Sequence, residues 1–342
     1  MSRGLDMTDI NINRPLLLYL VSVTLLILMI LPLYGEPYMI SILTSSFIYL
    51  AAAEMWSFLA GHLRLISLGQ QAFLGLGMYT VLLLNEIYKW PLWASVVFSA
   101  LIGASAAGLL SLSFLRLRGF YFSLATILFS EILFHSFLNW TLTGGATGLT
   151  LSIGFKISMQ ISYYAALIVS ILSILIIYYF HNSKIGFAIR ATGCDEEAAA
   201  EIGVNVFLIK ASCLIVSGAI TALSGAIFII RAALVNPYSG FSFEWGLALV
   251  FISVIGGIGT IIGPIIGSVI YVVLRSILAG FIGLSMLLQG IICVVILTIA
   301  PAGVWGLISA AGKSWGKIKR PLKVLPSYVV RKFYKSRKIS SI

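Results

Sequence analysis

Long uninterrupted runs of apolar residues constrain this chain more than any other feature of its sequence. Ten runs, bounded by Pro, Gly or charge, each approach the length that a helix needs to cross about 30 Å of hydrocarbon. Strands of a membrane barrel would instead alternate polar and apolar residues. Because a backbone in lipid must satisfy its own hydrogen bonds, the runs predict an all-α, polytopic transmembrane helix bundle. They cover residues 15–33, 38–60, 66–84, 91–115, 119–140, 162–180, 207–230, 244–262, 264–280 and 283–300.

The composition agrees with a lipid solvent. Of the 342 residues, 60% are apolar and only 10% are charged, which is more apolar surface than a water-soluble fold could bury. The three cysteines are far apart and form no C-x-x-C pair, so no disulfide framework and no metal site is expected. No motif of a soluble enzyme occurs, and residues 306–314 have one residue too many for a phosphate loop. We therefore expect no enzyme of the soluble type and no cofactor bound by this chain.

The distribution of basic residues predicts the orientation. If both termini are cytoplasmic, most basic residues fall in inner connections, as the positive-inside rule requires. The predicted number of spans is ten, and it falls to eight or nine if residues 61–66 or 256–267 re-enter the membrane. The inner connections then carry Arg3, Arg14, His62, Arg64, Arg116, Arg118, Lys184, Arg190 and Lys210, and the outer ones carry Lys89, Lys156, Arg231 and Arg275.

The chain is expected to contain one transmembrane domain, residues 15–306, between a short cytoplasmic N-terminus, 1–14, and a cytoplasmic tail, 307–342. Residues 313–342 hold ten basic residues and no acidic one. A basic segment directly after a last span is typical of contact with anionic lipid headgroups, and we expect no nucleic-acid partner.

The inner connection 181–206 contains the clearest local signal. Asp195 can cap a short helix over 196–201, whose acidic residues favour the helix N-terminus, and Gly203 can end it. Such a helix makes a compact projection between two spans. The simplest interpretation is a solvated helix that any multispan protein could carry.

The same connection resembles a loop that the permeases of ATP-binding-cassette importers share, because Glu197-Ala198-Ala199 is followed by Gly203 at the spacing E-A-A-x-x-x-G. Four further segments, in the same order along the chain, resemble the permease family for branched-chain amino acids, of the LivM type. Two departures, Thr260 in place of a serine and the pair Gln70-Gln71, bear on the substrate more than on the fold. The segments are 67–80 (SLGQQAFLGLGMYT), 117–133 (from LRGFYFSLAT to EIL), 142–149 (LTGGATGL) and 254–267 (VIGGIGTIIGPIIG), and PAGVWG at 301–306 ends the last span in the same manner.

This resemblance implies a permease subunit in a bacterial inner membrane that imports branched-chain amino acids. It also implies three kinds of partner: cytosolic ATPase subunits that use ATP, a second homologous permease, and an external substrate-binding protein. In the family the loop is the coupling helix that sits in a groove of the ATPase. The implied coupling residues are Asp195, Glu196, Glu197, Ala198, Ala199 and Gly203.

Several polar residues and glycines are candidates for the translocation pathway. Acidic residues inside lipid are costly, so Glu54 and Glu131 should face the bundle or a water-filled cavity. Glu131 has two interpretations, a pathway residue or a structural partner of His135 one helical turn away. Gly259, Gly263 and Gly267 either allow close helix packing or accompany a helix broken near Pro264. The candidate pathway residues are Ser67, Gln70, Gln71, Thr126, Glu131, Gly256 and Gly257.

Other functions remain open at this point. An ATP-driven permease for urea, short amides, simple sugars or another small polar solute would share the fold and the loop. An ion-coupled secondary transporter would usually need more intramembrane acids than this chain has. A membrane-embedded enzyme is the third alternative, but Glu54, His62 and His135 have no recognisable catalytic spacing.

Overall fold

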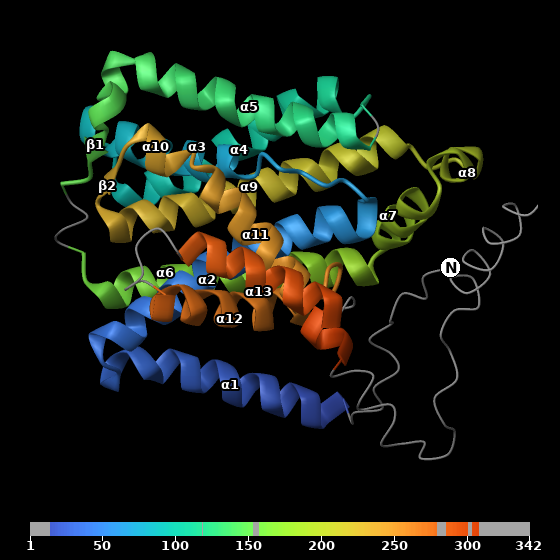
Figure 1. Ribbon diagram of the computed structural model, residues 1–342, viewed down its shortest axis with the longest axis horizontal. Helices are drawn as coiled ribbons and strands as arrows, with labels where there is room; N and C mark the ends of the chain where they lie inside the picture. Colours follow the sequence, from blue (N-terminus) through green and yellow to red (C-terminus); the bar gives the residue numbers. More distant parts are fainter. Residues whose placement is uncertain (1–13, 118, 153–156, 279–284, 300–302, 308–342) are drawn as a thin grey trace, which may run out of the picture. The chain divides into compact units, whose positions relative to one another are not determined.

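The computed structural model describes residues 14–117, 119–152, 157–278, 285–299 and 303–307. Within these ranges each of the ten apolar runs contains a helix, so the predicted helical membrane bundle is confirmed (Figure 1). Six of the described helical stretches are long and apolar enough to cross a membrane. The long helices are α1 (Arg14–Tyr34), α2 (Pro37–Leu63), α3 (Gln71–Leu82, continued by a π-helical turn Leu83–Ile87), α4 (Leu92–Phe114), α5 (Phe120–Asn139), α6 (Met159–Asn182), α9 (Val206–Ala232), α11 (Phe243–Gly256), α12 (Ile262–Leu278) and α13 (Ser285–Ile299).

Helix α2 lies at the centre of the bundle. It packs against α6, α9, α11 and α12, and its side chains from Phe47 to Leu59 are buried around the whole helix. A helix that is apolar on every side belongs in a core. The small side chains of Ala51, Ala52 and Ala53 allow close approach there, and the Ser253 hydroxyl of α11 donates to the Ala53 carbonyl at 3.2 Å.

Between α2 and α3 the chain is not helical, and we call residues 64–70 the break segment. Arg64 ends α2 in the left-handed conformation (φ 55°), and α3 begins only at Gln71. The prediction of a helix from residue 66 is therefore wrong at its start. The reason is tertiary: a Cβ on Gly69 would lie 1.8 Å from the Thr126 carbonyl oxygen, so the segment runs directly against α5. Of the two regions named as alternatives to a simple connection between spans, 61–66 and 256–267, the first thus overlaps a break that extends to residue 70.

The second region, between α11 and α12, is also interrupted. α11 ends at Gly256, residues 257–261 form a loop, and Pro264 lies in the first turn of α12, where its missing N–H costs nothing. The chain is thus broken near Pro264, as one interpretation expected, and the break lies before the proline. A Cβ on Gly267 would lie 2.0 Å from the Ile252 carbonyl oxygen, so this glycine allows close packing of the two helices, as one interpretation expected.

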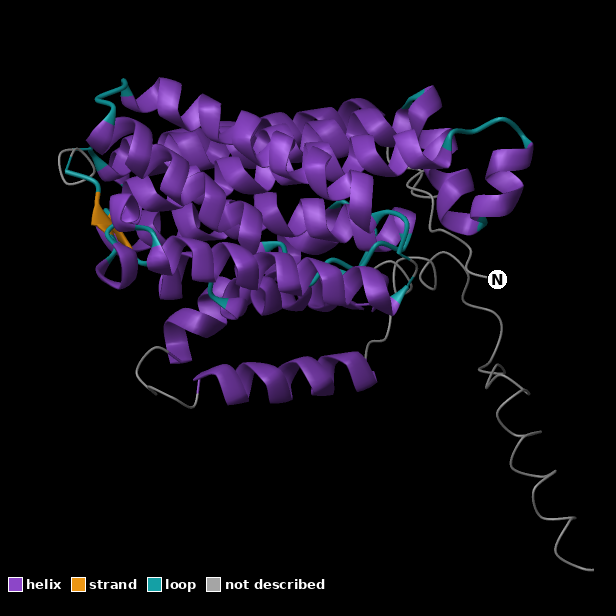
Figure 2. Cartoon of the chain, turned by 90° about the horizontal axis from the view of Figure 1, so that it is seen from above, coloured by secondary structure: helices purple, strands orange, loops and turns teal. Residues whose placement is uncertain are grey.

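Short elements mark the two ends of the bundle. Strands β1 (Leu149–Thr150) and β2 (Leu234–Val235) pair antiparallel at one end, beside α10 (Pro237–Gly240). At the opposite end, α7 (Lys184–Cys194) and α8 (Glu196–Glu201) connect α6 to α9 (Figure 2). The sequence predicted α8 but not α7 or the strands. The predicted terminal segments fall outside the described residues except for Arg14 and Leu307.

Candidate functional site

Helix α8 has the local structure that the sequence predicts. The Asp195 carboxylate accepts from the backbone N–H of Glu197 at 2.9 Å and of Ala198 at 3.2 Å, which caps the helix. Gly203 follows with φ 88°, a conformation that favours glycine. Ala199 points inward and is only 2% exposed, whereas Glu196, Glu197 and their neighbours form an exposed face. We call α7 and α8 together the helical knob.

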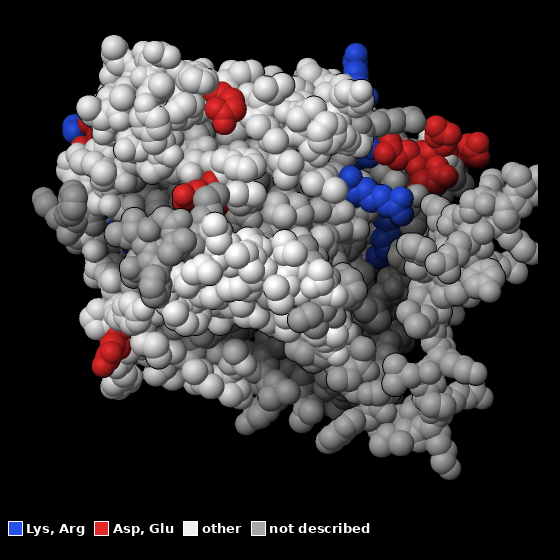
Figure 3. Space-filling view, viewed as in Figure 1, with Lys and Arg blue, Asp and Glu red and all other residues white. Residues whose placement is uncertain are grey.

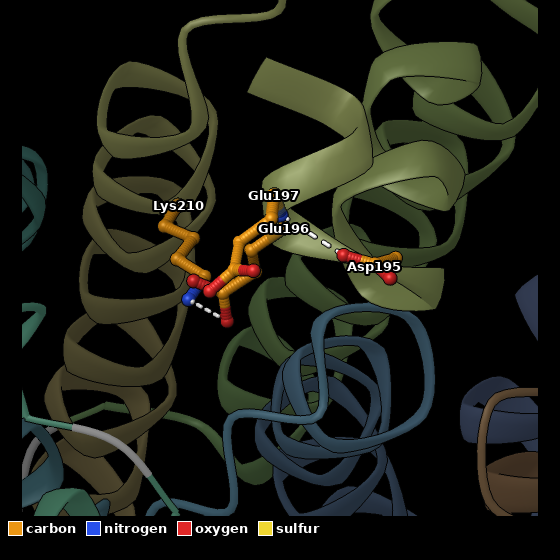
Figure 4. Close-up of polar contacts among 4 residues, drawn as sticks. All are labelled: Asp195, Glu196, Glu197 and Lys210. Carbon is orange, nitrogen blue, oxygen red and sulfur yellow. Dashed lines mark hydrogen bonds and ion pairs between the residues drawn. The ribbon is translucent and has the colours of Figure 1, made fainter. Parts of the chain in front are cut away.

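An ion pair between a buried lysine and a partly exposed glutamate fastens the knob to the bundle (Figure 4). Nζ of Lys210, in the first turns of α9, lies 2.6 Å from Oε1 of Glu196, and the two side chains are 6% and 41% exposed. A lysine this deeply buried needs a partner, because an unpaired charge away from water is costly. Sequence reasoning counted Lys210 among the inner basic residues but gave it no role, since its burial depends on how α8 folds back.

Helix α7 connects the knob to two further helices. Ser183 caps it by accepting from the Gly186 N–H at 3.2 Å, and Arg190 donates to the His181 carbonyl at 3.0 Å. A Cβ on Gly193 would lie 1.8 Å from the His62 carbonyl oxygen, so α7 touches the end of α2 directly. The knob therefore contacts α2, α6 and α9 at once.

Charge is concentrated at this end. Acidic side chains gather over α8 with lysine and arginine side chains beside them, while the face of the bundle in Figure 3 carries few charges between its two ends. This distribution fits a bundle whose middle lies in lipid and whose knob lies in water.

Four of the predicted pathway residues come together around the break segment. The Thr126 hydroxyl of α5 accepts from the Leu68 N–H at 3.1 Å, and Gln70 Nε2 donates to the hydroxyls of Ser217 at 2.7 Å and Thr221 at 3.1 Å on α9. On the α2 side, the Trp56 indole N–H donates to the Ser67 carbonyl at 2.6 Å. Side chains of α2 and α5 thus satisfy backbone groups of a segment that has left its helix, and α9 holds the side chain of Gln70.

Several polar atoms in this interior have no protein hydrogen-bond partner among the described residues. They include the Ser67 hydroxyl, Gln70 Oε1 and both amide atoms of Gln71, all in side chains that are 2% exposed or less. Leaving such groups unpaired is costly, so they are available to a water or to a passing solute. Glu54 Oε1 also lacks a hydrogen-bond partner among the described residues. Glu54 is only 1% exposed, which confirms that it faces the bundle.

The remaining candidates lie apart from this cluster. Glu131 is exposed on α5, so the first alternative, that it faces the bundle of this chain, is wrong, and a water-filled cavity stays a prediction. The structure shows no hydrogen bond or ion pair between Glu131 and His135, both of which are described. Among the six stretches long enough to cross a membrane, α5 is the least buried, with 28% of its best window inside, in line with the exposure of Glu131. Gly256 and Gly257 lie at the end of α11, where a Cβ on Gly256 would meet the Gly263 carbonyl oxygen at 1.9 Å.

These features define the chain as a membrane permease. It forms an apolar multi-pass bundle, its polar interior is built around a broken helix, and a helical knob is fastened to one end. It belongs to the family described as the permease component of the branched-chain amino acid transport system, whose model matches residues 38–301. The matched range includes both the break segment and the knob.

Individual relatives agree with this membership. The chain is 30% identical to the high-affinity branched-chain amino acid transport system permease protein LivM of Salmonella typhimurium, over 78% of this chain and 71% of that protein. LivM of Escherichia coli is 29% identical over the same shares. LivH, a permease protein of the high-affinity branched-chain amino acid transport system in Salmonella typhimurium, is 28% identical over 41% of this chain and 46% of its own length. No solved structure matches the chain.

Proposed function

We propose that this chain is the permease subunit through which an ATP-binding-cassette importer carries branched-chain, hydrophobic amino acids across the bacterial inner membrane. The observation that carries the proposal is that one family match, over residues 38–301, runs through both the polar break segment and the helical knob. The substrate class follows the names of the LivM relatives. The partial similarity to LivH supports a second, related permease as the partner in the membrane.

In this proposal the chain crosses the membrane ten times, and the knob faces the cytoplasm. Basic residues support that orientation, because Arg64, Arg116, Lys184 and Arg190 lie at or near the knob end. The opposite end holds the pair β1 and β2 and would face outward, toward an external substrate-binding protein.

The knob is the proposed contact with a cytosolic ATPase. α8 is short, capped and exposed on its acidic face, and the pair Lys210–Glu196 ties it to α9. A docked ATPase that closes on ATP would therefore move α9 directly and α2 through Gly193. The ATP would be bound and hydrolysed by the partner, and this chain would transmit the movement.

The break segment is the proposed place where the substrate passes. Unpaired amide and hydroxyl groups of Ser67, Gln70 and Gln71 suit the charged end groups of an amino acid, and Thr126 holds the segment in place. The N-terminus of α3 begins at Gln71 and favours a carboxylate. Gly256 and Gly257 shape the second interruption on the proposed inner side. The exposed face of α5 would meet the second permease, which would place Glu131 at the interface between the subunits.

A second candidate cargo is a small sugar. The ribose import permease protein RbsC of Haemophilus influenzae is 36% identical over 27% of this chain and 30% of its own length. Uptake of labelled isoleucine by cells that carry the transporter, with excess leucine, urea or ribose as competitor, separates the cargoes. We expect leucine alone to compete. Competition by ribose alone would favour a sugar, instead of an amino acid, as the cargo.

Co-purification tests the assembly. The tagged chain, extracted gently from its native membrane, should bring an ATPase and a second permease with it. Gly203→Pro should lose the ATPase, because proline cannot adopt φ 88° and lacks the N–H that donates to the Ala200 carbonyl at 3.0 Å. Gly203→Asn is the matched control, since asparagine tolerates this conformation. Recovery of the chain alone, with uptake that needs no ATP, would contradict the proposal and favour a secondary transporter.

A further inference from the structure

Two arginines meet in a cavity at the end of the bundle that carries β1 and β2. The cavity has a volume of about 290 Å³ and lies between the first turns of α2 and the last turns of α9 and α12. Arg231 of α9 and Arg275 of α12 both line it. Neither residue takes part in the break segment or the knob, so this cationic pocket needs its own explanation.

Hydroxyl groups hold both guanidinium groups in place. Arg231 donates to the hydroxyls of Ser45 and Ser41, the latter at 2.7 Å, and Arg275 donates to the Tyr49 hydroxyl. Each guanidinium carries five N–H donors, which is more than these partners use. The pocket therefore presents oriented donors that are still available to an acceptor.

The charge of the pocket is not balanced locally. Among the described residues, no carboxylate lies within 4.0 Å of either guanidinium. Glu244 influences Arg275 only from a longer distance. Arg231 and Arg275 together carry two positive charges, and Glu244 offsets only about one of them. Uncompensated charge near hydrocarbon is costly. A singly charged anion would complete the site.

The position of the pocket indicates which anion it takes. Tyr38, Val273 and Ile277 on the adjoining turns are 63%, 40% and 67% exposed, so large hydrophobic side chains are uncovered on this chain beside the pocket. α2 begins and α12 ends at this level, so a bilayer that surrounds the bundle would bring its phospholipid headgroups here. The break segment is held by Trp56 of α2, Thr126 of α5, and Ser217 and Thr221 of α9, and none of these residues lines the pocket.

We propose that Arg231 and Arg275 bind the phosphate group of a membrane phospholipid. A phosphodiester carries one negative charge and accepts the paired, planar donors of arginine well. The acyl chains would then lie along the exposed apolar residues of α2 and α12. The site would hold one lipid against the joint of α2, α9 and α12.

Native mass spectrometry of the purified full-length chain, titrated with phosphatidylglycerol, tests this site. The wild type should retain one tightly held lipid, and the double variant Arg231→Gln/Arg275→Gln should bind it at least about tenfold more weakly. Lys89→Gln is the matched control, because it removes a cation between α3 and α4 that does not line the pocket. Equal lipid retention by wild type and double variant would overturn the proposal.

Competition and crosslinking separate the sources of the anion. Excess inorganic phosphate or isoleucine should not displace the lipid; displacement by phosphate would make this a site for free anions, and displacement by isoleucine a substrate site. Because the double variant could misfold, a phosphatidylglycerol with a photoreactive headgroup is also applied to the wild type. It should label peptides within 37–49 and 269–278, and labelling only elsewhere would overturn the assignment.

Discussion

Gly77 of α3 lies so close to Ala222 of α9 that a Cβ at Gly77 would stand 1.9 Å from the Ala222 carbonyl oxygen. The backbones of these two helices are therefore in direct contact beside the break segment. Gly77→Ala should destabilise the bundle by about 1–3 kcal/mol, the usual cost of overpacking. Thermal unfolding in detergent measures the change. Gly108→Ala on α4, whose nearest neighbour would be 3.8 Å away, is the control and should unfold like the wild type.

Substitution of Glu196 should loosen the knob more than substitution of its ion-pair partner, Lys210. Glu196→Gln leaves the buried lysine without a charge partner and should weaken docking of the knob by about 1–2 kcal/mol, discounted because Glu196 is partly exposed. Lys210→Met removes the buried charge itself and should cost less. Protease cleavage within residues 183–205 reports loosening of the knob. Equal cleavage of the two variants would show that burial of Lys210 does not govern the pair.

Glu54→Gln should preserve ATP-driven uptake to within about threefold. Glu54 is buried and one carboxyl oxygen has no partner among the described residues, so an uncharged amide of the same shape fits the site. An ion-coupled transporter that used Glu54 as its proton site would lose uptake entirely. Initial rates of labelled isoleucine uptake in energised cells decide between the two.

Gln70→Leu should reduce uptake by about tenfold or more while leaving the unfolding temperature nearly unchanged. The Ser217 and Thr221 hydroxyls that it bonds can turn to carbonyls of their own helix, so the fold tolerates the loss. Ser217→Ala keeps the Gln70 amide and one of its acceptors, and should stay near the wild-type rate. If single variants of Ser67, Gln70 and Thr126 all transport normally, the break segment is not the pathway.

Local features of the fold could be predicted from the sequence. The apolar runs predict the helices, because a lipid-spanning helix makes all its backbone hydrogen bonds within one run. The short helix with its Asp195 cap and Gly203 end was also predictable, since all its determinants lie within nine residues.

Features that depend on contacts between distant segments could not be predicted. Helix α3 starts late because of the fit of Gly69 against Thr126, which no periodicity within residues 66–84 reveals. Glu131 was placed inward because an acid in an apolar run is costly, but that argument does not say whether this chain or a neighbouring subunit covers it. Arg231 and Arg275 are 44 positions apart in sequence, so their pocket appears only in the folded bundle.

Two of the anchors of the break segment lie on α2 and α9, the two central helices that the knob also contacts. Trp56 of α2 holds the carbonyl of Ser67, and Ser217 and Thr221 of α9 hold the side chain of Gln70, with only two residues between these anchors. The knob contacts the same two helices at the ends nearest these anchors, at His62 of α2 and Lys210 of α9. Any movement of α2 relative to α9 therefore changes the distance between the two ends of residues 67–70. This short piece of chain thus responds directly to movement that begins at the knob.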